Sequence, residues 1–128
     1  GPCIFMTDLD CEPFDVFHGK IVVTMRSFLP EVTDIVAEYP SHFPKCHGGP
    51  LSKNDHAKLG IADPHKSFYP KGGHIVTEEG HDRLYWACGV TPSIVAHNAK
   101  LPLMIVHTPG HAMITDIETE SLWQEESV

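Results

Sequence analysis

The sequence predicts an α+β domain, a two-layer sandwich in which a mixed, mostly antiparallel sheet packs against two helices. Short runs rich in β-branched and aromatic residues are interleaved with two segments of helical character. The length of 128 residues and the hydrophobic content of 41% are enough for one core and too little for a second domain. We expect a single domain over residues 1–117 and an acidic tail or linker over residues 118–128.

The N-terminal part of the chain supplies two expected strands and one helix. A short edge strand is expected over residues 5–11, and a strand over residues 20–26, where β-branched residues are frequent. A helix is expected over residues 30–39, ended by Pro40. Its apolar residues recur at helical spacing, so we expect them to pack on the sheet; they are Val32, Ile35, Val36 and Tyr39.

Residues 41–70 contain many Pro, Gly, Asp and His residues and predict a long ordered loop or a pair of short turns. A β-hairpin is expected next, with strands over residues 74–77 and 83–88 and a turn between them. Thr91 is the expected N-cap of a helix over residues 92–99, because Pro92 fits the first helical position. Two apolar strands over residues 103–107 and 112–117, joined by a turn, complete the expected fold.

Composition excludes several classes of protein. The 17 acidic and 9 basic residues give a formal charge of −8, and no basic run is present to follow a phosphate backbone, so nucleic acid is not an expected partner. No apolar stretch has the length of a membrane span and the N-terminus lacks a secretory pattern, so we expect a soluble chain. The four cysteines form no CxxC pair, which indicates reduced thiols inside the cell. Gly1 and Pro2 are either native or the remnant of an expression tag.

The first candidate site is the junction between the strand over residues 83–88 and the following helix. Backbone N–H groups of Gly89, Val90 and Thr91 would point out of the helix end, where a carboxylate or phosphate binds well. Cys88 would lie beside them. The alternative is a plain strand-to-helix connection with Cys88 as a small core residue.

Two further Gly- and His-containing turns lie next to expected strand ends, and the one over residues 107–116 would meet this junction at one rim of the sheet if their strands are adjacent. The turn over residues 43–50 carries His47, Gly48 and Gly49. The turn over residues 107–116 carries two histidines four positions apart, but the Pro-Gly between them argues against the helix that a zinc pair of this spacing requires. A metal site with His47, Cys88 or Asp116 and a nucleophilic Cys88–His pair remain alternatives, although we expect no metal and no cofactor. The candidate residues of this turn are His107, His111 and Asp116.

At these same turns the sequence resembles a hydro-lyase family whose eukaryotic members are D-glutamate cyclases. The matching pieces, in the order of the family, are GKIVVTMRS, FPKCHGGP, LGIAD, YWACGVTP and VHTPGHAMITDI. The resemblance extends over residues 5–117, and this region is similar to the C-terminal half of the family's usual domain. Two departures stand out: Met6 occupies a position where the family usually has Arg, and residues 51–58 differ from the family's pattern.

The resemblance implies a hydro-lyase that interconverts D-glutamate and 5-oxo-D-proline plus water, acting on a small molecule without a cofactor. It implies the mitochondrial matrix if the source is an animal, with the cytoplasm as the alternative. Chemistry nominates His107, His111 and His47 for proton transfer, because imidazole takes up and releases protons near neutral pH. Arg26 would bind the α-carboxylate and Asp116 would orient a histidine or hold the ammonium group. Backbone N–H groups of Gly48, Gly49 and the strand-to-helix junction would stabilise the oxyanion.

A different class of function remains open. The chain would then be a non-catalytic metal-binding, carboxylate-binding or interaction module. Homo-oligomerisation, or docking to a missing N-terminal half, would accompany either reading, because an interdomain apolar surface would otherwise be exposed.

Overall fold

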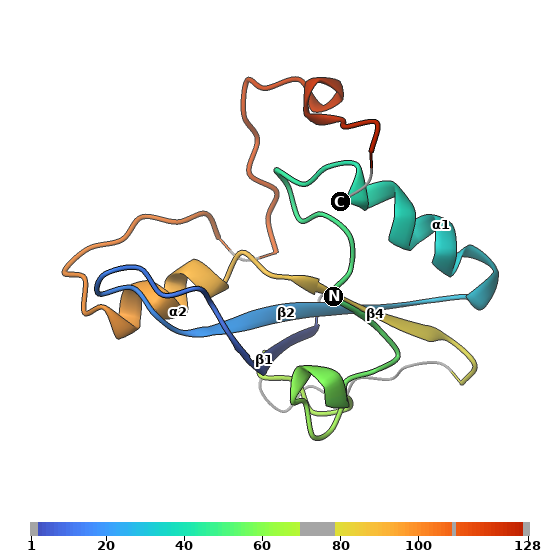
Figure 1. The fold of residues 1–128 in the computed structure, drawn as a ribbon, viewed down its shortest axis with the longest axis horizontal. Coiled ribbons are helices and arrows are strands. Elements are labelled where there is room, and N and C mark those ends of the chain that lie inside the picture. The colour runs from blue at the N-terminus through green and yellow to red at the C-terminus, as the bar shows by residue number, and fades with distance from the viewer. Residues whose placement is uncertain (1–2, 70–78, 109, 127–128) are drawn as a thin grey trace.

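The structure is a computed structural model that describes residues 3–69, 79–108 and 110–126. Four strands form one antiparallel sheet in the order β1-β2-β4-β3. Helices α1 and α2 lie on one face of this sheet (Figure 1), so the predicted α+β sandwich is confirmed. The elements are β1 (Cys3–Asp10), β2 (Lys20–Phe28), α1 (Pro30–Ser41), β3 (Ser52–Lys53), the 3₁₀ helix η1 (Ala57–Leu59), β4 (Asp82–Ala87), α2 (Thr91–Asn98) and the 3₁₀ helix η2 (Thr119–Leu122).

The register between β2 and β4 decides which side chains share each face of the sheet. Thr24 pairs with Trp86 and Met25 with Tyr85, and successive residues of a strand point to opposite faces. Tyr85 therefore belongs to one buried layer and Trp86 to the other. The first layer, closed from outside by residues of the η1 segment, is a hydrophobic cluster of Phe5, Val23, Met25, Leu59, Ile61 and Tyr85.

Most of the expected elements are present with small shifts in their ends. The strand predicted over residues 20–26 extends to Phe28, and the one predicted over residues 83–88 is β4. The helix predicted over residues 92–99 begins at Thr91 and ends at Asn98. The predicted strand over residues 74–77 lies outside the described residues. In the part of the chain that is described, no helix has the length and apolarity needed to cross a bilayer.

The strands predicted over residues 103–107 and 112–117 are wrong, since the described residues of this region form no β-ladder. Their apolar character is genuine, but it is exposed to solvent: Ile105 is 88% and Ile114 is 91% accessible. Strand propensity reflects packing against neighbouring strands, and no described strand lies beside these residues to pair with them.

Helix α1 lies where it was expected, but it packs on the sheet through a different face. Thr33 is fully buried and Val36 is half-buried, whereas the predicted core residue Ile35 is 65% exposed. Helical spacing identifies an apolar stripe but not the surface against which it packs. The helix also continues one residue past Pro40, so Pro40 does not end it.

Thr91 does not cap α2, contrary to prediction. Val90 occupies the N-cap, and the helix has no side-chain capping hydrogen bond. The Thr91 hydroxyl instead accepts a hydrogen bond from Val22 N at 2.9 Å and lies 3.3 Å from Val22 O. It thereby ties the first turn of α2 to β2, which fixes the position of the helix on the sheet.

The segment that was expected to be a frayed tail packs on the C-terminal end of α1 (Figure 1). The Trp123 indole stacks on the His42 ring with 4.0 Å between centroids and lies close to the Phe43 ring at 5.3 Å. Gln124 N donates to His42 O at 2.8 Å. Residues after position 117 are therefore in contact with the end of α1. A domain boundary at residue 117 stays a prediction.

The Tyr85 hydroxyl is buried in the hydrophobic cluster without a hydrogen-bond partner among the described residues. Burial raises the pKa of this phenol, and the charge of Arg83 partly opposes the rise. A buried hydroxyl that has lost its hydration without gaining a partner destabilises the fold by about 1–3 kcal/mol.

We therefore expect Tyr85→Phe to raise the free energy of unfolding by about 1 kcal/mol, because the ring is retained and only the unpaired hydroxyl is removed. Urea denaturation followed by circular dichroism measures the change. Tyr69→Phe is the matched control, since Tyr69 is 58% exposed and its substitution should leave stability within about 0.5 kcal/mol. A loss of stability in Tyr85→Phe would show that the hydroxyl has a partner.

Candidate active site

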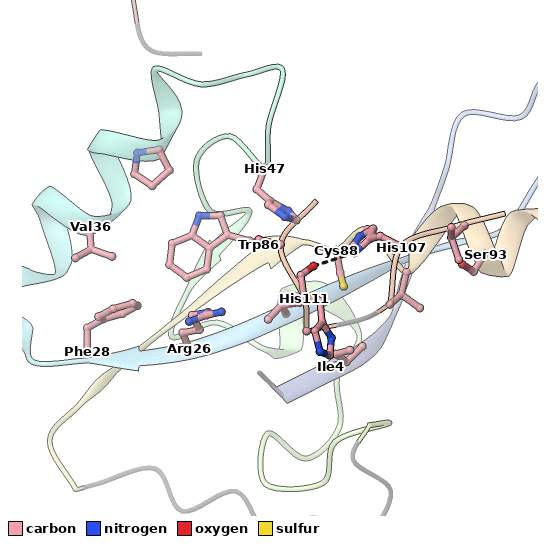
Figure 2. A pocket seen from close by; sticks show the side chains of 17 residues that line it. Ile4, Arg26, Phe28, Val36, His47, Trp86, Cys88, Ser93, His107 and His111 are labelled. Atoms are coloured by element: carbon pink, nitrogen blue, oxygen red, sulfur yellow. Dashed lines mark hydrogen bonds between the residues drawn. The ribbon is translucent and has the colours of Figure 1, made fainter. Parts of the chain in front are cut away.

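A cavity of about 650 Å³ lies between the α1 and α2 face of the sheet and the segment that follows α2. Residues from β1, β2, β4, α1, the turn after α1, the strand-to-helix junction and α2 line it, together with residues 106–107 and 110–112. Arg26 lies near the middle of this cavity in Figure 2. Apolar side chains gather toward one end of the cavity, among them Phe28, Val36 and Trp86. Potential proton-transfer groups gather toward the other end, among them Cys88, His107 and His111.

The apolar end is built by β2 and α1 around an aromatic pair. The rings of Phe28 and Trp86 meet edge to face, with 6.0 Å between centroids, and Val36 and Pro40 of α1 complete this end. Trp86 is only 9% exposed. This end can hold the aliphatic part of a ligand but offers it few hydrogen bonds.

Arg26 is the cation of the cavity. It follows Thr24 and precedes Phe28 on the same face of β2. No carboxylate in the described part of the chain forms an ion pair with it. A guanidinium that faces a largely apolar cavity without a protein counterion is well suited to bind a carboxylate in bidentate geometry.

His47 lines the cavity from the turn after α1. Its Nδ1 lies 2.7 Å from Ala87 O, and because a carbonyl oxygen can only accept, Nδ1 carries the proton in this bond. When the ring is neutral, this hydrogen bond selects its Nδ1–H tautomer. Its Nε2 keeps a lone pair that can accept a proton.

His107 is held in the same way by a second backbone carbonyl. Its Nδ1 lies 3.0 Å from His111 O and 3.1 Å from Thr108 O, so Nδ1 is again the donor and Nε2 is the acceptor. Figure 2 shows the bond between His107 and His111. A Cβ placed on Gly89 would lie 3.7 Å from His107 Nε2, so this nitrogen faces the strand-to-helix junction across one van der Waals contact.

The strand-to-helix junction contributes Cys88, Gly89 and Val90 to the cavity lining. Thr91 N donates to Cys88 O at 3.0 Å and is therefore used within the turn. The N–H groups of Gly89 and Val90 have no acceptor among the described residues. These two groups, at the positive end of α2, can donate to an oxyanion beside His107.

Four predicted site residues do not line the cavity. Gly48, at φ +67°, supports the turn after α1, and Gly49 packs against Ser41, where an added Cβ would lie 3.2 Å from Ser41 Cβ. Thr91 is engaged with β2, as described above. Asp116 is exposed beyond the cavity.

The walls of the cavity were not predicted from the sequence, whereas its histidines, Arg26 and Cys88 were. Thr24 and Phe28 flank Arg26 at i±2, and Trp86 lies two residues before Cys88. Alternate residues of a strand share a face, so the predicted site residues Arg26 and Cys88 already indicated that residues two positions away would lie beside them. Val36 and Pro40 required knowledge of which face of α1 packs on the sheet.

Within residues 3–69, 79–108 and 110–126, no three His, Cys, Asp or Glu side chains are placed to hold a metal ion together. The described residues that line the cavity have side chains and N–H groups suited to acid–base chemistry. Two histidines with fixed tautomers, two free N–H groups and one unpaired guanidinium surround the same cavity. This arrangement can bind a carboxylate, move protons and stabilise a developing oxyanion.

Comparison with known proteins identifies the family of this chain. The sequence model of the family described as D-glutamate cyclase matches residues 2–116. "Putative hydro-lyase YcsI" of Bacillus subtilis (strain 168) is 40% identical over 119 residues, which are 93% of this chain and 46% of the relative. A "Putative hydro-lyase" of Jannaschia sp. (strain CCS1) is 38% identical over 118 residues, covering 92% of this chain and 44% of the relative.

The chain thus spans less than half the length of these curated relatives. The family match nevertheless includes β1, β2, β4, both helices and every histidine that lines the cavity. By its sequence and by the agreement of the matched region with the described cavity, this chain belongs to the D-glutamate cyclase family of hydro-lyases.

Proposed function

We propose that this chain carries the proton-transfer site of a lyase that interconverts D-glutamate with 5-oxo-D-proline and water. The observation that supports the proposal most directly is His107, whose Nδ1 donates to His111 O while Nε2 faces the Gly89 end of α2. A base is thereby placed beside the two N–H groups that suit an oxyanion. The family match gives the reaction class, and the choice of substrate is our own inference.

Ring closure of glutamate requires a particular balance of atoms and protons. The α-nitrogen bonds to the γ-carboxyl carbon, and one C–O bond of that carboxyl breaks. Starting from an ammonium and a carboxylate, the nitrogen gives up two protons, and the departing oxygen takes up two and leaves as water. The site must therefore accept protons on one side of the reacting carbon and return them on the other.

The cavity offers a group for each of these tasks. Nε2 of His107 accepts one proton from the attacking nitrogen and returns it to the departing oxygen, while a protonated imidazole of His47 or His111 gives the oxygen its second proton and is reprotonated by the second proton of the nitrogen. The N–H groups of Gly89 and Val90 stabilise the tetrahedral oxyanion.

Arg26 binds the α-carboxylate and leaves the γ-carboxyl group free to react. By holding the α-carboxylate, the Arg26 guanidinium orients the substrate along the cavity. Asp116 has no part in this assignment, because it is exposed beyond the cavity.

A second function is favoured by Arg26 alone. A cation in a largely apolar cavity, without an ion-pair partner in the described residues, also fits a carboxylate-binding module that performs no chemistry. Binding without turnover would distinguish this function from the lyase.

We expect the chain to convert D-glutamate and 5-oxo-D-proline into each other and to leave L-glutamate unchanged, as followed by chiral chromatography. His107→Ala should lower turnover by about 10²- to 10⁴-fold, because the proton acceptor is removed. His97→Ala is the matched control: His97 lies exposed on α2, does not line the cavity, and its removal should leave turnover unaltered. Equal rates for His107→Ala and the parent chain would contradict the assignment.

We expect Arg26→Gln to weaken D-glutamate binding by about 10- to 100-fold, because a charge-assisted hydrogen-bonded pair is lost. Isothermal titration calorimetry measures the dissociation constant. Lys58→Gln removes the same charge on the η1 segment, on the opposite side of the sheet, and should leave binding as it is. Equal affinities of both variants would show that Arg26 does not receive the carboxylate.

A further inference from the structure

Trp123 and Gln124 lie outside the region that matches the family, which ends at residue 116, and yet they contact the segment that carries His47. His42, which stacks on Trp123, is the C-cap of α1. The His42 ring Nδ1 lies 2.7 Å from Gln124 O, while His42 O accepts from Gln124 N. The contact thus consists of two hydrogen bonds and a stacked pair at one residue.

From His42 the contact leads directly to the cavity. Phe43 packs edge to face on Trp123 and accepts a backbone hydrogen bond from Cys46 N at 2.9 Å, which closes the turn before His47. His47 then reaches Ala87 O on β4. Only four residues lie between His42, whose ring Trp123 covers, and His47, whose imidazole lines the cavity.

The same contact holds the far end of the segment that carries His107. After α2, this segment is tied at its start by Leu101 N, which donates to Ala96 O at 3.2 Å. Its described residues before η2 have no regular secondary structure and some of them line the cavity, and just after η2 Trp123 and Gln124 dock on the end of α1. Fixing both ends of a segment that lacks a ladder reduces the conformations that its middle can adopt.

We infer that Trp123 is a positioning residue for the site: by docking on α1 it holds the two segments that present His47 and His107 to one cavity. This inference rests on the proposed function for its catalytic meaning. The effect of Trp123 on the orientation of His47 and His107 can be measured without substrate. Trp123 touches no reacting group and acts only through the turn at Phe43 and through the closure of residues 101–122.

Three variants of the full chain test the inference. Trp123→Ala removes the stack, whereas Trp123→Phe keeps an aromatic ring against His42. Gln124→Pro removes the N–H that donates to His42 O. Trp123 already has φ −64° and ψ 136°, the conformation that a residue before proline adopts, so residue 123 needs no new backbone shape when the donor at position 124 is removed. Ile117→Ala, at a 55% exposed residue of the same segment, is the control.

The substrate-free readout is the ¹⁵N and ¹H signals of the His47 and His107 imidazoles in NMR. Each Nδ1 lies within hydrogen-bond distance of a backbone carbonyl, although both side chains are exposed, so a held ring gives the ¹⁵N signals of the Nδ1–H tautomer. We expect Trp123→Ala and Gln124→Pro to lose or broaden both signals, and Trp123→Phe and Ile117→Ala to retain them. Turnover should fall about tenfold or more in the first two variants, mainly in kcat, and return to within about twofold in Trp123→Phe.

Unchanged imidazole signals in Trp123→Ala and Gln124→Pro would overturn the inference. If Trp123→Ala does not fold, Gln124→Pro decides, because it retains both rings of the stack. Loss of the signals in a chain that converts no glutamate would uphold the positioning role and reject the proposed reaction. The two proposals are therefore separated by a single set of samples.

Discussion

The antiparallel pairing of β2 with β4 is the interaction on which the rest of the structure depends. Because Met25 is opposite Tyr85 and Thr24 is opposite Trp86, one register assigns Tyr85 to the hydrophobic cluster and Trp86 to the cavity wall. A slip of one residue would exchange the two faces and place Arg26 in the cluster. Neighbouring elements reinforce the register, since β1 pairs with β2 on one side and β3 with β4 on the other.

The central strands and α2 could be predicted because their local signals agree with their tertiary surroundings. β2 is rich in β-branched residues and is buried between two strands, and Pro92 begins α2 where a proline fits. The region around Ile105 and Ile114 has equally strong apolar signals, but a strand also needs a partner, which sequence periodicity does not supply. The face of α1 was misjudged for a similar reason: Ile35 is apolar at the right spacing, yet Thr33 is the residue that packs on the sheet.

The polar groups of the candidate site were easier to predict than its walls. His47, His107, Cys88 and Gly89 follow or precede expected elements at Gly-containing turns, and such turns gather at the end of a sheet. Asp116 does not line the cavity, because the described residues 112–117 do not form the strand that was expected to end there. The roles of all these residues remain predictions. Trp86 and Phe28 were missed, although they lie at alternate positions from Cys88 and Arg26 on the same strands.

The hydrogen bonds of His47 and His107 end on main-chain carbonyls, and this gives the site an unusual tolerance to sequence drift. A side-chain acceptor is lost by substitution, whereas the carbonyls of Ala87 and His111 persist whatever residue occupies those positions, provided that the backbone keeps its path. His111 therefore contributes separately through its imidazole and through its main chain. A substitution at position 111 would remove the first contribution and leave the second, so the orientation of His107 depends on the path of the backbone.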